Sequence, residues 1–267
     1  DWTLFEEGGA ISIELAWYLS CDGDTARLWQ ESADDPPSHE TFTRIARNAE
    51  ASGFSTILVP SHQSSAHFRR EAPAWDSLVT AAVIIPATRT TKLLLAPRTG
   101  VIEPAVAARV LASLDQLSGG RILYNVITGG KIQTAFSGEL EHDDRYERTE
   151  EFMQILEGLW TRERFSFEGK HYRIKDAMVS PRPVQKPRIP FFLAGSSENA
   201  REIAVRRAEY SVFWSESPAH PRALWALVER IASDDPHGSA GSFVAHPEAS
   251  RYFRRHGARE GDRFGGG

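Results

Sequence analysis

Cysteine, positive charge and long apolar runs are all scarce in this sequence. Its one cysteine, Cys21, excludes a disulfide scaffold and has no cysteine or histidine near it in sequence, so we expect an inert thiol and no metal site. The formal charge of −5 and the lack of a basic stripe argue against a nucleic-acid partner. The longest apolar run, residues 79–87, contains Thr80 and Pro86 and falls well short of the roughly 20 residues that cross a bilayer.

Several common sequence signatures are also missing. The first ten residues are acidic and carry no basic, apolar leader, so we expect a cytoplasmic protein that does not bind membranes. The sequence contains no H-E-x-x-H, no Walker loop and no G-x-S-x-G, which leaves little support for a hydrolase. The 267 residues, 41 % of them hydrophobic and 25 % charged, are instead typical of a folded globular chain.

Strand-length apolar runs alternate with segments of helical period along most of the chain. This pattern is typical of βαβ units around a parallel sheet. We predict strands at 12–19, 55–60, 92–97, 121–128, 190–194 and 210–214. We predict helices at 39–52, 73–87, 105–118, 148–162, 198–208 and 221–232. Two segments interrupt the alternation: a polar loop at 129–144, and a β-hairpin with a proline-rich linker at 165–190.

Six βα units are too few to close an eight-stranded barrel. We therefore predict an α/β fold, a TIM-like (β/α) barrel that is incomplete, over residues 1–233. Residues 234–267 are rich in Gly and Arg, have Val244 as their one aliphatic side chain, and are predicted to be a disordered tail. A doubly wound open sheet is the alternative, although the first strand-to-helix turn lacks G-x-G-x-x-G.

Parallel α/β folds place their active sites at the carboxyl ends of the strands. The loops there are small, polar and rich in hydroxyl groups. In Gly195-Ser196-Ser197, free backbone N–H groups at a helix start predict a phosphate site, with a simple helix cap as the alternative. His142 and Tyr146 would share one helix face and one ligand, unless residues 142–148 are only a solvated charge cluster that caps the next helix.

Three polar residues at strand ends are further candidates. Asn125, in an otherwise apolar strand, must hydrogen-bond either a ligand or a neighbouring strand end, and Thr128 closes the same strand. Arg98 closes the third strand, where it would bind an anionic group of substrate or cofactor, or else form a surface salt bridge.

The chain resembles the flavin-dependent, bacterial-luciferase-like monooxygenases, and within them the branch that contains alkanesulfonate monooxygenase. Five stretches carry this resemblance, and their occurrence together, in this order within residues 12–233, makes it specific. They are Ala107-Ala108-Arg109 with Leu114-Asp115-Gln116-Leu117-Ser118-Gly119-Gly120-Arg121, Asn125-Val126-Ile127-Thr128-Gly129, His142-Asp143-Asp144-Arg145-Tyr146-Glu147-Arg148, Phe167-Glu168-Gly169-Lys170-His171-Tyr172, and Ala194-Gly195-Ser196-Ser197.

The resemblance implies a TIM-like barrel that takes reduced FMN from a separate NAD(P)H-dependent flavin reductase and uses dioxygen to oxygenate a small organic substrate, with organosulfur compounds as one candidate class. It places His142, Tyr146 and Ser196 or Ser197 at the ribityl chain and phosphate, and Ser61 at the flavin. Arg98 stands where the sulfonate branch has an arginine and, with His142, is a candidate catalytic residue. A homo-oligomer is also expected.

Two departures from the family pattern shape the hypothesis. The loop after the second predicted strand has Ser64 and Ser65 where the sulfonate branch usually has a cysteine, and it is longer. The family also continues with two more βα units, where this chain has its Gly/Arg tail. We therefore expect a truncated monooxygenase, weakly active or inactive as it stands, with a non-catalytic FMN-binding protein related to luciferase as the alternative.

Overall fold

The computed structural model describes residues 16–24, 32–129, 140–195 and 197–212, together with the backbone of two short paired strands, β1 (Phe5–Glu6) and β2 (Gly9–Ala10). Several predicted features lie outside these residues. They are the ends of the first and last predicted strands, most of the loop at 129–144, Ser196, the helix at 221–232 and the tail at 234–267.

Six parallel strands form the main sheet, and all six belong to the predicted set. They are β3 (Ala16–Tyr18), β4 (Thr56–Val59), β5 (Lys92–Leu95), β6 (Ile122–Ile127), β9 (Phe191–Ala194) and β10 (Tyr210–Val212). Their spatial order, β10-β9-β6-β5-β4-β3, follows the chain. A doubly wound sheet reverses its strand order at a switch point, whereas a barrel adds each strand beside the last. The doubly wound alternative is therefore wrong, and the incomplete TIM-like fold is confirmed.

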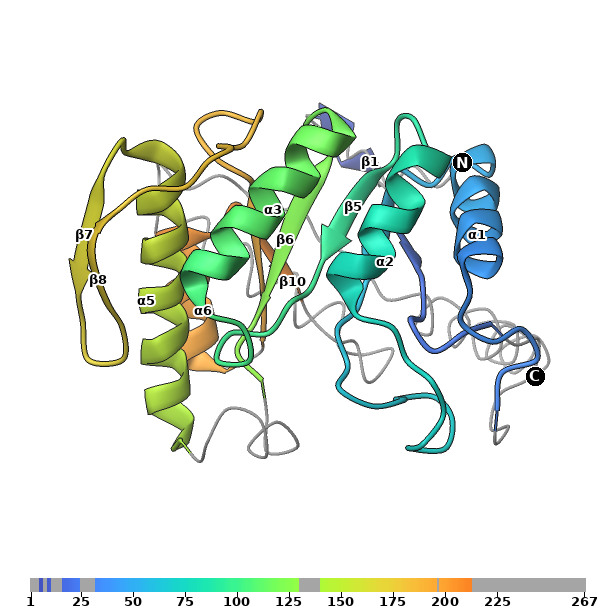
Figure 1. Ribbon diagram of the computed structural model, residues 1–267, viewed down its shortest axis with the longest axis horizontal. Coiled ribbons are helices and arrows are strands. Elements are labelled where there is room, and N and C mark those ends of the chain that lie inside the picture. Colours follow the sequence, from blue (N-terminus) through green and yellow to red (C-terminus); the bar gives the residue numbers. More distant parts are fainter. Residues whose placement is uncertain are drawn as a thin grey trace, which may run out of the picture.

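The helices cover one face of this sheet. They are α1 (His39–Ala51), α2 (Ser77–Ile84) with the short η1 (Ile85–Ala87), α3 (Pro104–Ser118), α5 (His142–Thr161) and α6 (Glu198–Arg207). The main buried core joins all five α-helices to alternate strand residues such as Ile57, Leu93 and Tyr124. A second, smaller cluster on the other face consists of strand residues alone, including Leu58, Leu94 and Phe192. The sheet is thus a half-barrel, with α1, α2, α3 and α5 in front of it in Figure 1.

Two helices begin several residues away from the predicted start. The helix expected at 73–87 starts at Ser77, because the Asp76 carboxylate accepts hydrogen bonds from the N–H groups of Leu78 and Val79 and so caps it there. The helix expected at 148–162 starts six residues earlier, at His142. Its first turns are polar and are held by ion pairs instead of burial, so apolar periodicity did not reveal them.

The predicted hairpin is present as β7 (Phe165–Glu168) and β8 (Arg173–Ala177), which are antiparallel and lie beside α5 (Figure 1). The Glu151 carboxylate on α5 accepts hydrogen bonds from the N–H groups of Lys170, His171 and Tyr172 at 2.7–3.0 Å. A Cβ on Gly169 would lie 2.4 Å from that carboxylate. The Phe167–Tyr172 stretch therefore has a structural role.

The Leu114–Arg121 stretch is also structural. Asp115 is fully buried, and its carboxylate accepts from the N–H groups of Val184 and Gln185 and from the Gln185 side chain at 2.7–3.1 Å. The Arg121 guanidinium donates to the carbonyls of Ile85 and Thr91. These bonds fasten the segments that precede β5 and β9 at the amino ends of the strands, away from the edge where a site is expected. Within the described residues, no helix combines the length and the apolar character that a membrane crossing requires.

Candidate functional site

The carboxyl ends of the six parallel strands form one rim, and the predicted site residues lie along it. Strand β6 occupies the middle of the rim because it pairs with β5 on one side and β9 on the other. Asn125 and Thr128, at its carboxyl end, are only 4 % and 6 % exposed. Neither Asn125 Oδ1 nor Thr128 Oγ1 has a hydrogen-bond partner among the described residues. The alternative in which Asn125 Oδ1 binds a neighbouring strand end is not observed, and buried polar atoms of this kind need a partner.

The starts of α5 and α6 meet on the β9 side of the rim. His142 and Tyr146 share one helix face, as predicted, and their ring centroids are 4.9 Å apart. A Cβ on Gly195 would lie 3.3 Å from the Tyr146 hydroxyl and 2.7 Å from Ala200 Cβ, so only glycine allows this close approach. The Asn199 side chain donates to Asp143 at 2.8 Å and ties the two helices together. Two motifs some fifty residues apart in sequence thus form one corner.

Ser197 is the N-cap of α6. Its Oγ accepts a hydrogen bond from the Ala200 N–H at 3.2 Å, which is the helix-cap arrangement given as the alternative to a phosphate site. The two roles are compatible, because a capping serine keeps its own hydroxyl proton and leaves other first-turn N–H groups available to an anion. Phosphate binding at Gly195 and Ser197 stays a prediction.

Arg98 lies on the β5 side of the rim. Its Nε donates to the carbonyl of Ser61 at 2.8 Å, and one terminal nitrogen lies 3.5 Å from His62 Nδ1. Among the described residues, no carboxylate forms an ion pair with it. The surface salt bridge given as an alternative for Arg98 is therefore not observed within the described part of the chain. Ser61 is buried, and its carbonyl fixes the guanidinium in place.

Three residues on this side were not singled out from the sequence: Asp22, His62 and His67. Asp22 is 3 % exposed, and its carboxylate accepts from Ser65 Oγ at 2.8 Å, from the N–H groups of Ala66 and His67 at 3.0 and 3.1 Å, and from Ser20 Oγ. His67 Nδ1 lies 3.1 Å from the same carboxylate. The available signal was an acidic residue after one strand and histidines after the next, since adjacent parallel strands bring such loops together.

The electrostatics of this group follow from burial and from the neighbours. Burial alone would raise the pKa of Asp22, but hydrogen bonds from His67, Ser20 and Ser65 outweigh it and hold that pKa well below its usual range. Burial, followed by the charges of Arg98 and His67, lowers the pKa of His62 to about 4. Cys21, also in this region, donates to the Pro60 carbonyl, and burial raises its pKa to about 12, in agreement with an inert thiol.

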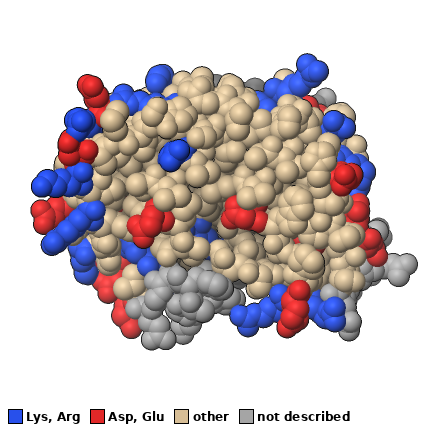
Figure 2. Space-filling model, viewed as in Figure 1, with Lys and Arg blue, Asp and Glu red and all other residues tan. Residues whose placement is uncertain are grey.

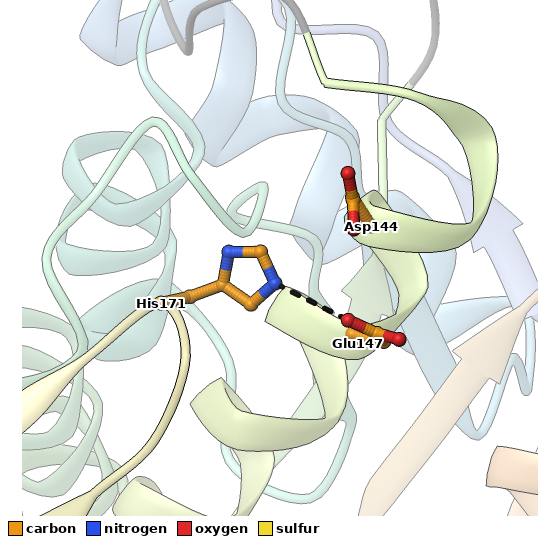
Figure 3. A group of neighbouring side chains, drawn as sticks. All are labelled: Asp144, Glu147 and His171. Atoms are coloured by element: carbon orange, nitrogen blue, oxygen red, sulfur yellow. Dashed lines mark ion pairs between the residues drawn. The ribbon is translucent and has the colours of Figure 1, made fainter.

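A cluster of Asp144, Glu147 and His171 offers ligand atoms within 4.8 Å of one another, and Figure 3 shows His171 pointing toward Glu147 on α5. The Lys170 ammonium lies 2.6 Å from Asp144 and 2.7 Å from Glu147, and His171 Nε2 is 3.7 Å from Glu147. Lys170 thus supplies the positive charge that a metal ion would otherwise bring to these two carboxylates. Part of the 142–148 stretch is therefore the charge cluster that the sequence offered as an alternative.

Comparison with known structures supports the fold. A riboflavin lyase, solved with modified FMN and riboflavin, matches 91 % of this chain and 66 % of its own at 21 % identity and a TM-score of 0.73. An EDTA monooxygenase from Chelativorans sp. BNC1 matches 87 % and 62 % at 21 % identity, and a long-chain alkane monooxygenase matches 88 % and 64 % at 19 %, both with a TM-score of 0.73. This chain therefore spans somewhat less than two thirds of the length of these proteins.

The matched structures differ in the cofactor that they carry. One is the oxygenating component of a 3,6-diketocamphane monooxygenase from Pseudomonas putida in complex with FMN (16 % identity, 88 % and 67 % coverage, TM-score 0.67). Another is a secondary alcohol dehydrogenase with an F420–acetone adduct (17 % identity, 88 % and 68 % coverage, TM-score 0.69). The family model for luciferase-like monooxygenases matches residues 21–246, which is most of the sequence. This chain therefore belongs to the luciferase-like monooxygenase family.

Proposed function

We propose that this protein binds reduced FMN along the rim of its half-barrel and inserts one atom of dioxygen into a small organic substrate, with organosulfur compounds as one candidate class. The observation that carries the proposal is a pair of buried oxygens in the middle of the rim, Asn125 Oδ1 and Thr128 Oγ1, for which the described residues provide no hydrogen-bond partner. Desolvated acceptors of this kind cost free energy unless a ligand satisfies them. A flavin offers ring N–H and ribityl hydroxyl groups that can do so.

The residues that would hold the cofactor fall into two groups. His142, Tyr146, Gly195 and Ser197 form the phosphate corner, where the N-terminus of α6 favours an anion through its free N–H groups and helix dipole. Ser196 belongs to the same prediction but lies outside the described residues. Asn125 and Thr128 would hold the ribityl chain or the ring edge, and Ser61, which follows β4, would contact the flavin.

The chain's own part in the chemistry is to position the reactants and to exclude water. When bound, reduced FMN supplies the electrons that activate dioxygen. The inner face of the sheet, with Leu58, Leu94 and Phe192 below the rim, provides an apolar wall that keeps water from the reacting groups.

A flavin titration followed by fluorescence tests this proposal. Ser197→Asp keeps a residue that caps helices well but adds a negative charge at the predicted phosphate position. We expect FMN affinity to fall by at least tenfold, since like-charge repulsion in a partly shielded site amounts to a few kcal/mol. F420 in place of FMN in the same titration tests the choice of cofactor, and we expect FMN to bind more tightly.

Ser38→Asp is the matched control, because Ser38 caps α1 in the same way, by accepting from the Thr41 N–H at 3.0 Å. It adds the same charge at another helix start and should leave FMN affinity unchanged. Equal affinities for wild type and Ser197→Asp would contradict the phosphate assignment. Tight FMN binding with no product and no hydrogen peroxide from photoreduced FMN and oxygen would favour the non-catalytic flavin-binding alternative.

We also propose that the active protein is a homo-oligomer that receives its flavin from a separate NAD(P)H-dependent flavin reductase. Figure 2 shows few charged side chains over the face formed by α2 and α3. Helix α2 contains no charged residue, and Val79, Val106 and Leu117 on these helices are 52–69 % exposed. An apolar surface of this kind is typical of a subunit contact. Val79→Glu with Val106→Glu is expected to lower the mass measured by light scattering.

A further inference from the structure

The start of α5 is acidic, although it forms part of the proposed phosphate corner. Residues 141–148 carry four acidic and two basic side chains. Asp143 and Asp144 in the first turn favour the helix, since carboxylates are stabilised at a helix N-terminus. The same carboxylates repel an anion that approaches His142 and Tyr146. A phosphate site at this corner therefore needs a group that offsets them.

A lysine of the β7–β8 hairpin lies against two of the carboxylates. The Lys170 ammonium is 2.6 Å from Asp144 and 2.7 Å from Glu147. These two acidic residues are three positions apart on α5, so they lie on the same face of the helix. Figure 3 shows both of them on α5, with His171 of the hairpin directed toward Glu147. One positive charge is thus shared by two negative ones.

The backbone of the hairpin holds Lys170 in this position. The Glu151 carboxylate, one turn further along α5, accepts from the N–H groups of Lys170, His171 and Tyr172. A side chain at Gly169 would collide with that carboxylate. A surface ion pair usually contributes little, because two long side chains must be ordered to form it. Here the backbone of the lysine is already fixed against the helix that carries both carboxylates, so less ordering is needed.

The two carboxylates are close enough to the phosphate corner to act on a charge there. Asp144 and Glu147 flank Tyr146 in the sequence. The Tyr146 hydroxyl in turn lies 3.3 Å from the position of a Cβ on Gly195. A helix with its side chains is about 10–12 Å across, and charges at physiological ionic strength interact over about 8 Å. These lengths are comparable, so an anion at Gly195 is repelled by any negative charge that Lys170 does not offset.

We propose that Lys170 is a positioning residue that sets the specificity of the cofactor site: it offsets Asp144 and Glu147, so that the start of α5 accepts a phosphorylated flavin in preference to an uncharged one. This inference rests on the proposed function, because it takes Tyr146 and Gly195 as part of the phosphate corner. Lys170 does not touch the cofactor and acts through the charge of α5. The hairpin that interrupts the βα alternation is thus part of the cofactor site.

FMN and riboflavin differ only in the phosphate, so together they test this role. Flavin fluorescence gives the dissociation constants of both ligands for wild type and Lys170→Met. We expect Lys170→Met to weaken FMN binding about 5- to 20-fold and riboflavin binding less than about twofold, since only FMN carries the charge. Lys170→Arg keeps the positive charge and should recover most of the preference for FMN. A general loosening of α5 would instead weaken the binding of both ligands alike.

Arg164→Met is the matched control. Arg164 lies at the other end of the same hairpin and pairs with Asp176, and both side chains are 61 % exposed. This variant also removes one positive charge but should leave both dissociation constants unchanged. A charge-balanced variant checks the cause: Lys170→Met combined with Asp144→Asn and Glu147→Gln removes the lysine and both carboxylates together. It should restore FMN affinity at least to the wild-type value.

Two results would overturn this inference: a ratio of the FMN and riboflavin dissociation constants in Lys170→Met equal to that of wild type, or no recovery in the charge-balanced variant. Wild type itself separates the two proposals. If it binds FMN no more tightly than riboflavin, the phosphate corner is wrong and the role of Lys170 is wrong with it. If it prefers FMN and Lys170→Met keeps the full preference, the phosphate corner stands and only the role of Lys170 is excluded.

Discussion

Two regions of the rim differ in whether their buried polar groups have hydrogen-bond partners among the described residues. Beside β3 and β4, the Asp22 carboxylate accepts hydrogen bonds from Ser20, Ser65, Ala66 and His67, so this carboxylate is satisfied within the protein. In the middle of the rim, on β6 and directly after it, Asn125 Oδ1 and Thr128 Oγ1 are buried with no partner among the described residues. The hydrogen-bonded carboxylate stabilises the free protein, whereas buried oxygens without partners cost it stability.

This difference separates residues that support the site from residues that bind. A satisfied buried charge is costly to disturb, because removing it leaves several donors unpaired. An unsatisfied buried oxygen is costly to keep, so its removal should benefit the free protein and harm only the complex. Stability measurements without ligand can therefore assign each residue to one group or the other.

The largest effect is expected for Asp22→Ala. Loss of the carboxylate leaves Ser65 Oγ and the N–H groups of Ala66 and His67 without an acceptor, so the free energy of unfolding in urea should fall by about 3 kcal/mol. Asp22→Asn should give an intermediate loss. Asp143→Ala is the control, because its carboxylate is 80 % exposed and its removal should have much less effect. If Asp22→Ala lowered the free energy of unfolding no more than Asp143→Ala does, the hydrogen bonds to Asp22 would not stabilise the protein.

A smaller effect is expected in the pH dependence of stability. The unfolded chain protonates His62 below about pH 6.5, whereas the folded chain does so only near pH 4, with Arg98, His67 and Asp22 as its charged neighbours. In this window the unfolded state binds more protons, so stability falls as the pH falls. In wild type, protonation of His62 across this window should lower the free energy of unfolding by about 2 kcal/mol, and His62→Gln should abolish this loss. The loss is smaller than the full pKa shift implies because the ring is partly exposed.

Urea denaturation of wild type and His62→Gln at several pH values measures this contribution. The difference between the two proteins isolates His62 from the other histidines, which titrate in both. Parallel stability curves between pH 4 and 6.5 would show that the folded state does not depress the pKa of this residue.

The smallest effect, of opposite sign, is expected for Thr128→Val. This hydroxyl is buried and has no partner in the described part of the chain, so its removal should leave the free protein as stable as before or up to about 1 kcal/mol more stable, and should weaken FMN binding. Thr99→Val is the matched control, since the Thr99 hydroxyl pairs with Thr149 at 2.8 Å, and it should cost about 1 kcal/mol. Equal destabilisation by both variants, read from their urea midpoints, would show that Thr128 is satisfied within the protein.

Apolar patterning predicted the architecture well where burial alone decides the structure. The strands at β4, β5, β6 and β9 are buried on both faces of the sheet, so they appear as continuous apolar runs. Patterning failed at the start of α5, where Lys170 from the distant hairpin pairs with Asp144 and Glu147. Such long-range ion pairs leave no periodic signal in the local sequence.

The site was predictable only in part, for a similar reason. Helix spacing placed His142 and Tyr146 on one face, and strand-end position selected Asn125, Thr128 and Arg98. The network around Asp22, His62 and His67 was missed, because its members come from loops after two different strands and each loop is irregular. A polar residue in a loop shows its role only when its neighbours in space are known.

The sequence by itself determined the alternation of strands and helices, and with it the parallel sheet, because a buried strand and an amphipathic helix each have a period that local residues reveal. Only the tertiary structure decided that the strands follow one another in order around a half-barrel, that Gly195 meets Tyr146, and that Arg98 faces His62 without an acidic partner among the described residues. These contacts join segments tens of residues apart. Their energies depend on distance and burial in the folded chain, which no local pattern records.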